Sequence, residues 1–149
     1  MSGIVYGFDA APIFKHLGGL ERLNAGHFAS VRREIGEYML GNVQDNFDGQ
    51  RLFDGSAMPP SKAAAKRAGK TLIDKHHLYD SYVYQLTGTG VEIGAGGVAS
   101  KYAAIHHFGG ETGRPGHRFI MKARPVLGVA AAQEKAMGDF MIAEIGRLP

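Results

Sequence analysis

The chain has 149 residues, 44% of them hydrophobic and 21% charged, and this composition is ordinary for one folded domain. It contains no cysteine, which excludes a disulfide framework, a thiolate zinc site and a cysteine nucleophile. The formal net charge of +3 comes from 17 basic and 14 acidic side chains and does not by itself indicate a nucleic-acid partner. The N-terminus shows no secretory signal, and no run of about 18 apolar residues is present, so we expect no membrane partner.

The first third of the chain is predicted to be mostly helical. Residues 3–8 have the composition of a short edge strand. Asp9 is then the predicted N-cap of a helix from about Ala10 to Asn24. A longer helix, from about Ala25 to Phe47, is indicated by apolar residues that recur three or four positions apart.

A loop is expected over residues 48–60, where two Asp-Gly steps and a pair of prolines follow the long helix. Ser61 is the predicted N-cap of a short helix over Lys62–Ala68, which Gly69 would end.

Basic side chains are concentrated in two of the predicted loops. Between Lys62 and Lys75 there are five basic residues and one acidic residue, Asp74. We expect mobile loops at about 48–75 and 109–118, and their basic residues have two interpretations: a solvated surface, or a surface that faces a polyanion or an acidic partner. The candidate docking residues are Lys62, Lys66, Arg67, Lys70, Arg114, Arg118 and Lys122.

Beyond residue 80 the pattern changes from helical spacing to alternation. Residues 81–87 are rich in aromatic and β-branched side chains, and residues 91–93 alternate apolar and polar side chains after a Gly-Thr-Gly turn, which predicts a β-hairpin. A short helix is expected over Ser100–His107, and Gly109–Gly116 is predicted to be loop.

A further strand is predicted at His117–Lys122 and a last helix at about Val126–Arg147. The chain is therefore predicted to be a single α+β domain over residues 1–149. Its small antiparallel sheet, formed by the hairpin at about 81–94 plus edge strands, would pack against the long N-terminal helix and the C-terminal helix.

Catalytic patterns are absent or incomplete. Gly69-Lys70-Thr71 resembles the end of a phosphate-binding loop, but Ala64 stands where that loop requires glycine. The pairs His76-His77 and His106-His107 suggest a metal site, but adjacent residues point in different directions and seldom bind the same ion. A composite site from both pairs and Glu111 is left open, and we predict a protein that is not an enzyme and holds no cofactor or metal.

Two late blocks resemble a known family. Lys101–Gly110 reads KYAAIHHFGG and Lys122–Gly128 reads KARPVLG. They are similar to the "Tyr-Ala-x-Ile-His-Gln-Phe-Gly-Gly" and "Ala-Arg-Pro-Phe-Leu-Gly" blocks of the phage virion morphogenesis, or tail completion, proteins of Mu-like and related tailed phages and prophages. Earlier features agree in order, so the resemblance covers roughly residues 28–130. His107 and Val126 depart from the family's Gln and Phe.

The resemblance implies a structural component at the head-proximal end of the tail, which completes the tail or prepares it for joining to the head. Such a protein is made in the host cytoplasm and ends in the virion. By analogy with such proteins we expect a homo-oligomeric ring, of six subunits, that contacts other tail or head–tail connector proteins. Whether the protein also contacts DNA in the lumen of this ring is left open.

The matched residues have the properties of structural or interface positions. Tyr102, Ile105 and Phe108 would pack one face of the short helix onto the sheet. Glycines after this helix allow a sharp reversal, and the residue before a proline avoids the helical region. The candidate motif consists of Tyr102, Ile105, His106, His107, Phe108, Gly109, Gly110, Arg124 and Pro125.

Two other classes of function compete with this one. A basic nucleic-acid-binding module would use the same two loops, with Tyr79, Tyr82 and Tyr84 as surfaces on which bases stack. A metalloenzyme would use the histidines.

Overall fold

A computed structural model describes residues 9–21 and 28–147 of the chain. Its elements, in chain order, are α1 (Ala11–Glu21), α2 (Ala29–Asp48), α3 (Lys62–Lys66), η1 (Tyr79–Ser81), β1 (Tyr82–Leu86), β2 (Val91–Ala95), η2 (Gly97–Ala99), α4 (Ser100–Phe108), β3 (Gly110–Arg114), β4 (His117–Met121) and α5 (Ala131–Gly146). The predicted α+β class is confirmed. The edge strand expected at 3–8 lies outside the described residues.

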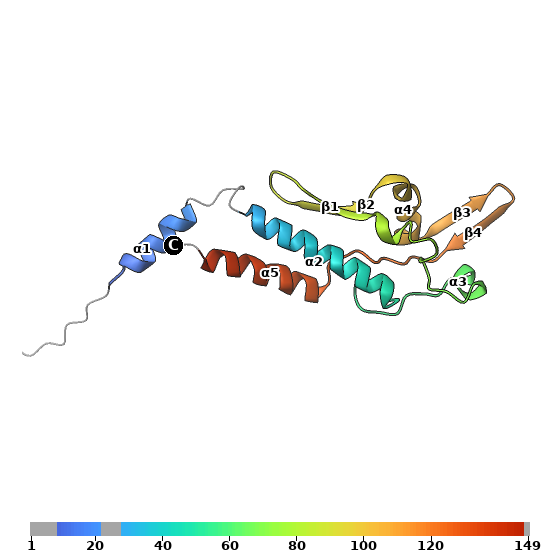
Figure 1. The fold of residues 1–149 in the computed structure, drawn as a ribbon, viewed down its shortest axis with the longest axis horizontal. Helices are drawn as coiled ribbons and strands as arrows, with labels where there is room; N and C mark the ends of the chain where they lie inside the picture. The colour runs from blue at the N-terminus through green and yellow to red at the C-terminus, as the bar shows by residue number, and fades with distance from the viewer. Residues whose placement is uncertain (1–8, 22–27, 148–149) are drawn as a thin grey trace, which may run out of the picture.

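Helix α2 is the element on which the others are assembled. It has 20 residues, which corresponds to about 30 Å, and its buried side chains recur at helical spacing. The β1–β2 hairpin packs along one side of α2, while α5 packs along another (Figure 1). Tyr38 and Phe140 hold the two helices together, with ring centroids 5.5 Å apart in an edge-to-face arrangement.

The strands form two separate antiparallel hairpins. β1 pairs with β2 and β3 pairs with β4, and each pair is its own two-stranded sheet. The expectation of one sheet with added edge strands is therefore corrected among the described residues. The loop predicted at Gly109–Gly116 is also corrected, because Gly110–Arg114 is a strand. Its sequence has low strand propensity, and pairing with His117–Met121 determines its conformation instead.

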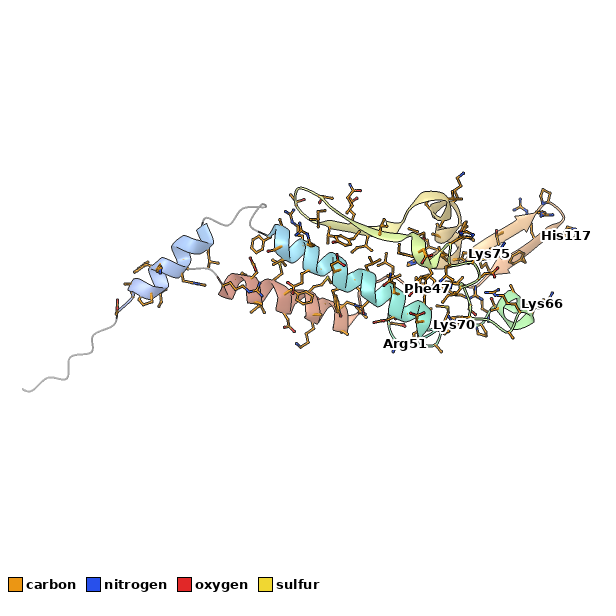
Figure 2. All side chains as sticks on the ribbon, viewed as in Figure 1. Phe47, Arg51, Lys66, Lys70, Lys75 and His117 are labelled. Atoms are coloured by element: carbon orange, nitrogen blue, oxygen red, sulfur yellow. The ribbon has the colours of Figure 1, made fainter. Side chains whose placement is uncertain are left out.

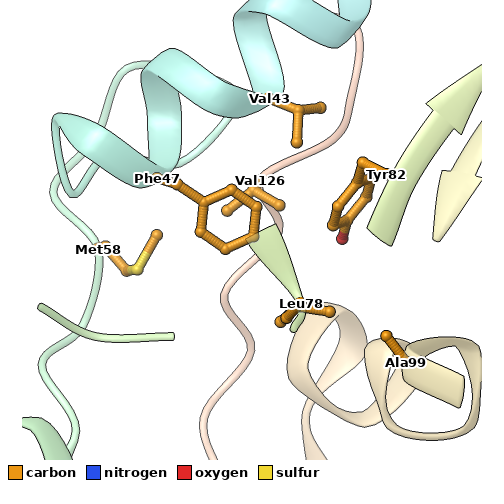
Figure 3. Close-up of a cluster of buried hydrophobic side chains, with 7 residues drawn as sticks. All are labelled: Val43, Phe47, Met58, Leu78, Tyr82, Ala99 and Val126. Carbon is orange, nitrogen blue, oxygen red and sulfur yellow. The ribbon is translucent and has the colours of Figure 1, made fainter. Parts of the chain in front are cut away.

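The core lies around the C-terminal end of α2. Phe47, from the last turn of α2, is fully buried, and the rings of Tyr79 and Tyr82 lie 5.5 and 5.8 Å from it. Segments far apart in sequence meet at this point (Figure 3). The buried cluster consists of Val43, Phe47, Met58, Leu78, Tyr82, Ala99 and Val126.

The last helix begins at Ala131, five residues later than predicted. Residues before it are held in an extended path by contacts with other parts of the chain. Asn46 donates a side-chain hydrogen bond of 2.9 Å to the Val126 carbonyl, and the Phe53 amide donates to the Pro125 carbonyl at 3.0 Å. These long-range bonds take the place of the helical bonds that the sequence pattern suggested.

The short helix α3 follows its predicted start. The Ala64 amide donates to the Ser61 hydroxyl at 3.1 Å, which is the expected N-cap interaction. The helix ends at Lys66, two residues before the predicted end at Ala68.

Two glycines of α2 provide a matched test of this packing. A Cβ atom at Gly36 would lie closer than 3.0 Å to ring carbons of Tyr84, whereas a Cβ at Gly41 would meet no atom within 4 Å. We predict that Gly36→Ala lowers the free energy of unfolding by about 1–3 kcal/mol, because the ring must shift. Gly41→Ala should raise it by about 0.5–1 kcal/mol through helix propensity.

Urea denaturation followed by circular dichroism measures both values. The packing of β1 on α2 would be contradicted if both alanine variants were more stable than the wild type.

Candidate functional site

One end of the molecule carries most of its positive charge. Residues 49–75 and 109–124 contain ten basic and three acidic side chains, a net charge of +7, so the rest of the chain has a net charge of −4. Lys66, Lys70, Lys75 and His117 lie together at this end, away from α1 (Figure 2). All seven basic residues predicted as docking residues are exposed there.

Three of these predicted residues already have partners within the chain. Lys70 donates through Nζ to the Asp48 carbonyl at 2.8 Å, at the C-terminal end of α2. Arg67 donates through Nη2 to the Lys70 and Ile73 carbonyls at 2.8 and 2.7 Å. Arg118 pairs with Glu111 at 3.5 Å, and such an exposed pair contributes little to stability.

The other four predicted residues are available to a partner. Lys62, Lys66, Arg114 and Lys122 make no side-chain hydrogen bond or ion pair with any described residue.

A groove of about 1000 Å³ lies between residues 60–78, called here the α3 segment, and the β3–β4 hairpin. Its floor is apolar, and its rim carries basic side chains. The apolar lining residues are Leu72, Leu78, Tyr102, Phe119, Ile120 and Met121. The charged rim includes Lys62, Lys75 and Lys122, together with the Arg67–Asp74 ion pair.

Arg124 fixes the two sides of this groove relative to each other. The residue is only 7% exposed. It donates through Nε to the Pro59 carbonyl at 2.6 Å and through Nη2 to the Pro60 carbonyl at 3.1 Å. A third bond runs from Nη1 to the Lys122 carbonyl at 3.2 Å. Since the partners are backbone groups of two distant segments, Arg124 is a clamp between them.

Gly109 sets the direction in which the hairpin leaves α4. It has a positive φ of 70°, and a Cβ here would lie 2.7 Å from both the Met121 carbonyl and the Ala123 amide. Only glycine fits this position without a backbone shift. The Arg124 amide then donates to the His106 carbonyl at 2.8 Å, so the two sequence blocks that carry the family resemblance are in direct contact.

The face predicted for α4 is corrected at one residue. Tyr102 is partly buried and packs against the core cluster, and Ile105 is half-buried. Phe108 is 77% exposed. It follows Tyr102 by six residues, which turns it about 120° away around the helix axis. The motif therefore contributes one exposed aromatic ring to the surface instead of a third packing residue.

His106 and His107 are partly buried. Burial lowers the pKa of His106, and the nearby positive charge of Arg124 lowers it further. Burial also lowers the pKa of His107. The His106 Nδ1 atom is buried and has no hydrogen-bond partner in the structure, while its ring lies edge-on to Tyr102 at 6.0 Å.

The composite metal site does not form. In the described part of the chain, no three His, Cys, Asp or Glu side chains come together in a way that would hold a metal ion. The two histidine pairs and Glu111 are therefore not assembled into one ligand set. Within residues 9–21 and 28–147, no helix has both the length and the apolar character needed to cross a membrane.

Comparison with known proteins identifies the family. A model of the phage virion morphogenesis family matches residues 9–146. The chain belongs to this family. It is 33% identical over 119 residues to "Mu-like prophage FluMu G protein 2" of Haemophilus influenzae, an alignment that covers 78% of each chain. No solved structure matches the chain.

The part of the chain that matches the phage virion morphogenesis family contains both the Arg124 clamp and the Gly109 turn. The family match includes α4, both hairpins and the extended segment before α5. Sequence reasoning marked Gly109 and Arg124 through this resemblance, but it missed the carbonyl partners of Arg124 and the apolar groove. No sequence signal places Ile120 and Leu72 in one groove, because they come from separate segments.

His106 makes stability depend on pH in a defined direction. Its folded-state pKa lies below the ordinary value of 6.5, so the unfolded chain binds more protons as the pH falls through that value. We predict that stability is highest above pH 6.5 and declines below it, and that His106→Gln reduces this decline.

Thermal melts between about pH 5 and pH 8 measure the effect, with His117→Gln at an exposed position as the matched control. An unchanged pH dependence in His106→Gln would show that burial of this imidazole has no such consequence.

Proposed function

We propose that this chain is a structural tail completion protein of a phage or prophage, which acts at the head-proximal end of the tail in tail assembly or head–tail joining. The observation that carries the proposal is the family match over residues 9–146, which spans nearly the whole chain. The Mu-like prophage relative supports the phage or prophage origin.

The properties of the family blocks support a role in assembly instead of catalysis. Gly109 provides a turn, Arg124 provides a clamp, and Tyr102 packs against the core. Each residue shapes the surface at the basic end. We therefore propose that the protein is not an enzyme and that it acts by taking part in the assembly of the particle.

The distribution of charge supports oligomerisation through unlike surfaces. A basic end of net charge +7 on a chain whose remainder is negative favours contacts between different faces of neighbouring copies. Heterologous contacts that close make a ring. We propose a ring, of six subunits by analogy with tail proteins, that joins the tail to the head–tail connector in the virion neck.

The same charge favours a second candidate, a nucleic-acid-binding module. Ten basic side chains in two neighbouring segments are enough for several phosphate contacts. Binding of duplex DNA with a steep salt dependence would support it, and no binding at low salt would exclude it.

Loss of the protein should separate heads from tails. We predict that the phage or prophage that encodes this chain, with its gene interrupted by an early stop codon, yields filled heads and free tails in negative-stain micrographs. Wild-type protein supplied in trans should restore joined, infectious particles.

Joined particles in the stop-codon mutant would contradict the proposed role. So would a mutant that makes no heads, because that defect belongs to an earlier step.

A further inference from the structure

We infer that the groove between the α3 segment and the β3–β4 hairpin binds an amphipathic, acidic segment of another virion protein. This inference deepens the proposed function, on which it rests, because it names the chemistry of the assembly partner. The segment would place apolar side chains on the groove floor and carboxylates along both edges.

The floor is suited to aliphatic side chains. Phe119 is 54% exposed and Ile120 is 74% exposed, although both line a concave surface. Phe119 and Ile120 are neighbours on β4, and the chain leaves more than half of each residue uncovered. A two-stranded hairpin of this kind is marginally stable in water by itself. An apolar occupant would remove these side chains from solvent.

The rim determines the charge of the occupant. Lys62 and Lys75 line the groove from the α3 side, and Lys122 lines it from the hairpin side. None of the three has a hydrogen bond or ion pair through its side chain with a described residue. The one acidic group of the lining, Asp74, lies 3.8 Å from Arg67, so four lysine and arginine side chains besides this pair leave the lining net positive. Positive charge on both sides favours a segment with carboxylates on both of its edges.

The groove differs from a nucleic-acid site in its floor. DNA binding by a basic surface relies on phosphates, and bases stack on aromatic planes. Here most of the apolar lining is aliphatic or thioether, as at Leu72, Ile120 and Met121. Such side chains pack better against the apolar face of a peptide.

A second copy of the chain is a poorer occupant on grounds of charge. Ile13, Phe14 and Leu17 of α1 are exposed and lie within five residues of one another, whereas other exposed apolar residues, such as Val98, Val129 and Ile142, are scattered over separate elements of the described chain. Lys15 and His16 lie among the apolar residues of α1, and the single acidic residue of α1 is Glu21. This segment would bring basic side chains toward a basic rim, so we assign the groove to a different protein.

The test uses fluorescence anisotropy with three fluorescein-labelled helical peptides of equal length. One has leucine at i, i+3, i+4 and i+7 and glutamate elsewhere; the second has lysine for glutamate, and the third has serine for leucine. We predict that only the leucine–glutamate peptide binds. Lys75→Glu or Ile120→Ser should weaken its binding by about tenfold or more.

Matched controls separate the groove from general attraction. Lys66 lies on α3 but outside the groove lining, so Lys66→Glu makes the same charge change at another site. Ile142 is 69% exposed on α5, so Ile142→Ser removes a comparable side chain elsewhere. Both controls should bind within about twofold of the wild type. Melting curves of all four variants check that they remain folded.

Several results would overturn the inference. Equal weakening by Lys66→Glu and Lys75→Glu would show unspecific charge attraction, and binding of the serine peptide would remove the role of the apolar floor. Duplex DNA that competes with the peptide and loses affinity in Ile120→Ser would assign the groove to nucleic acid. Self-association that Ile120→Ser abolishes would assign it to a second copy. Each of these results leaves the head–tail joining phenotype untouched, so the two proposals fail separately.

Discussion

A single buried guanidinium determines how the basic end of this molecule is arranged. Arg124 binds the carbonyls of Pro59 and Pro60, from the segment before α3, and that of Lys122, at the base of the second hairpin. Burying an arginine is costly unless its donors are satisfied, and here backbone carbonyls provide that satisfaction. The groove lies between these two segments, and Arg124 is itself one of its lining residues.

The rest of the fold consists of a packed region around the core and an exposed region at the basic end. Phe47 and its neighbours make the core at the end of α2, and α5 and the first hairpin cover the sides of that helix. The second hairpin and α3 extend beyond this core and expose both charge and apolar area. In the proposed role, the packed region would support the exposed surface that meets a partner.

The sequence predicted those elements in which the spacing of apolar residues matches the residues that the fold buries. The long helix α2 and the hairpin β1–β2 follow directly from the spacing of apolar residues such as Val43 and Tyr82. Strand β3 was missed, because its two glycines and polar residues have no strand pattern and its pairing with β4 is set by the turn. The start of α5 was misplaced, because Asn46 binds the Val126 carbonyl from 80 residues away. The groove could not be predicted, since its lining comes from segments brought together only by the fold, and the mobility expected at 48–75 and 109–118 stays a prediction.

The most direct test of this account measures the separation of the two sides of the groove. The chain has no cysteine, so Lys66→Cys and His117→Cys can carry spin labels on α3 and on the second hairpin without any background. Pulsed electron paramagnetic resonance should give a narrower distance distribution in this labelled protein than in the same protein with Arg124→Ala, with α2 remaining helical in both. Distributions that coincide would show that Arg124 does not hold the basic end together.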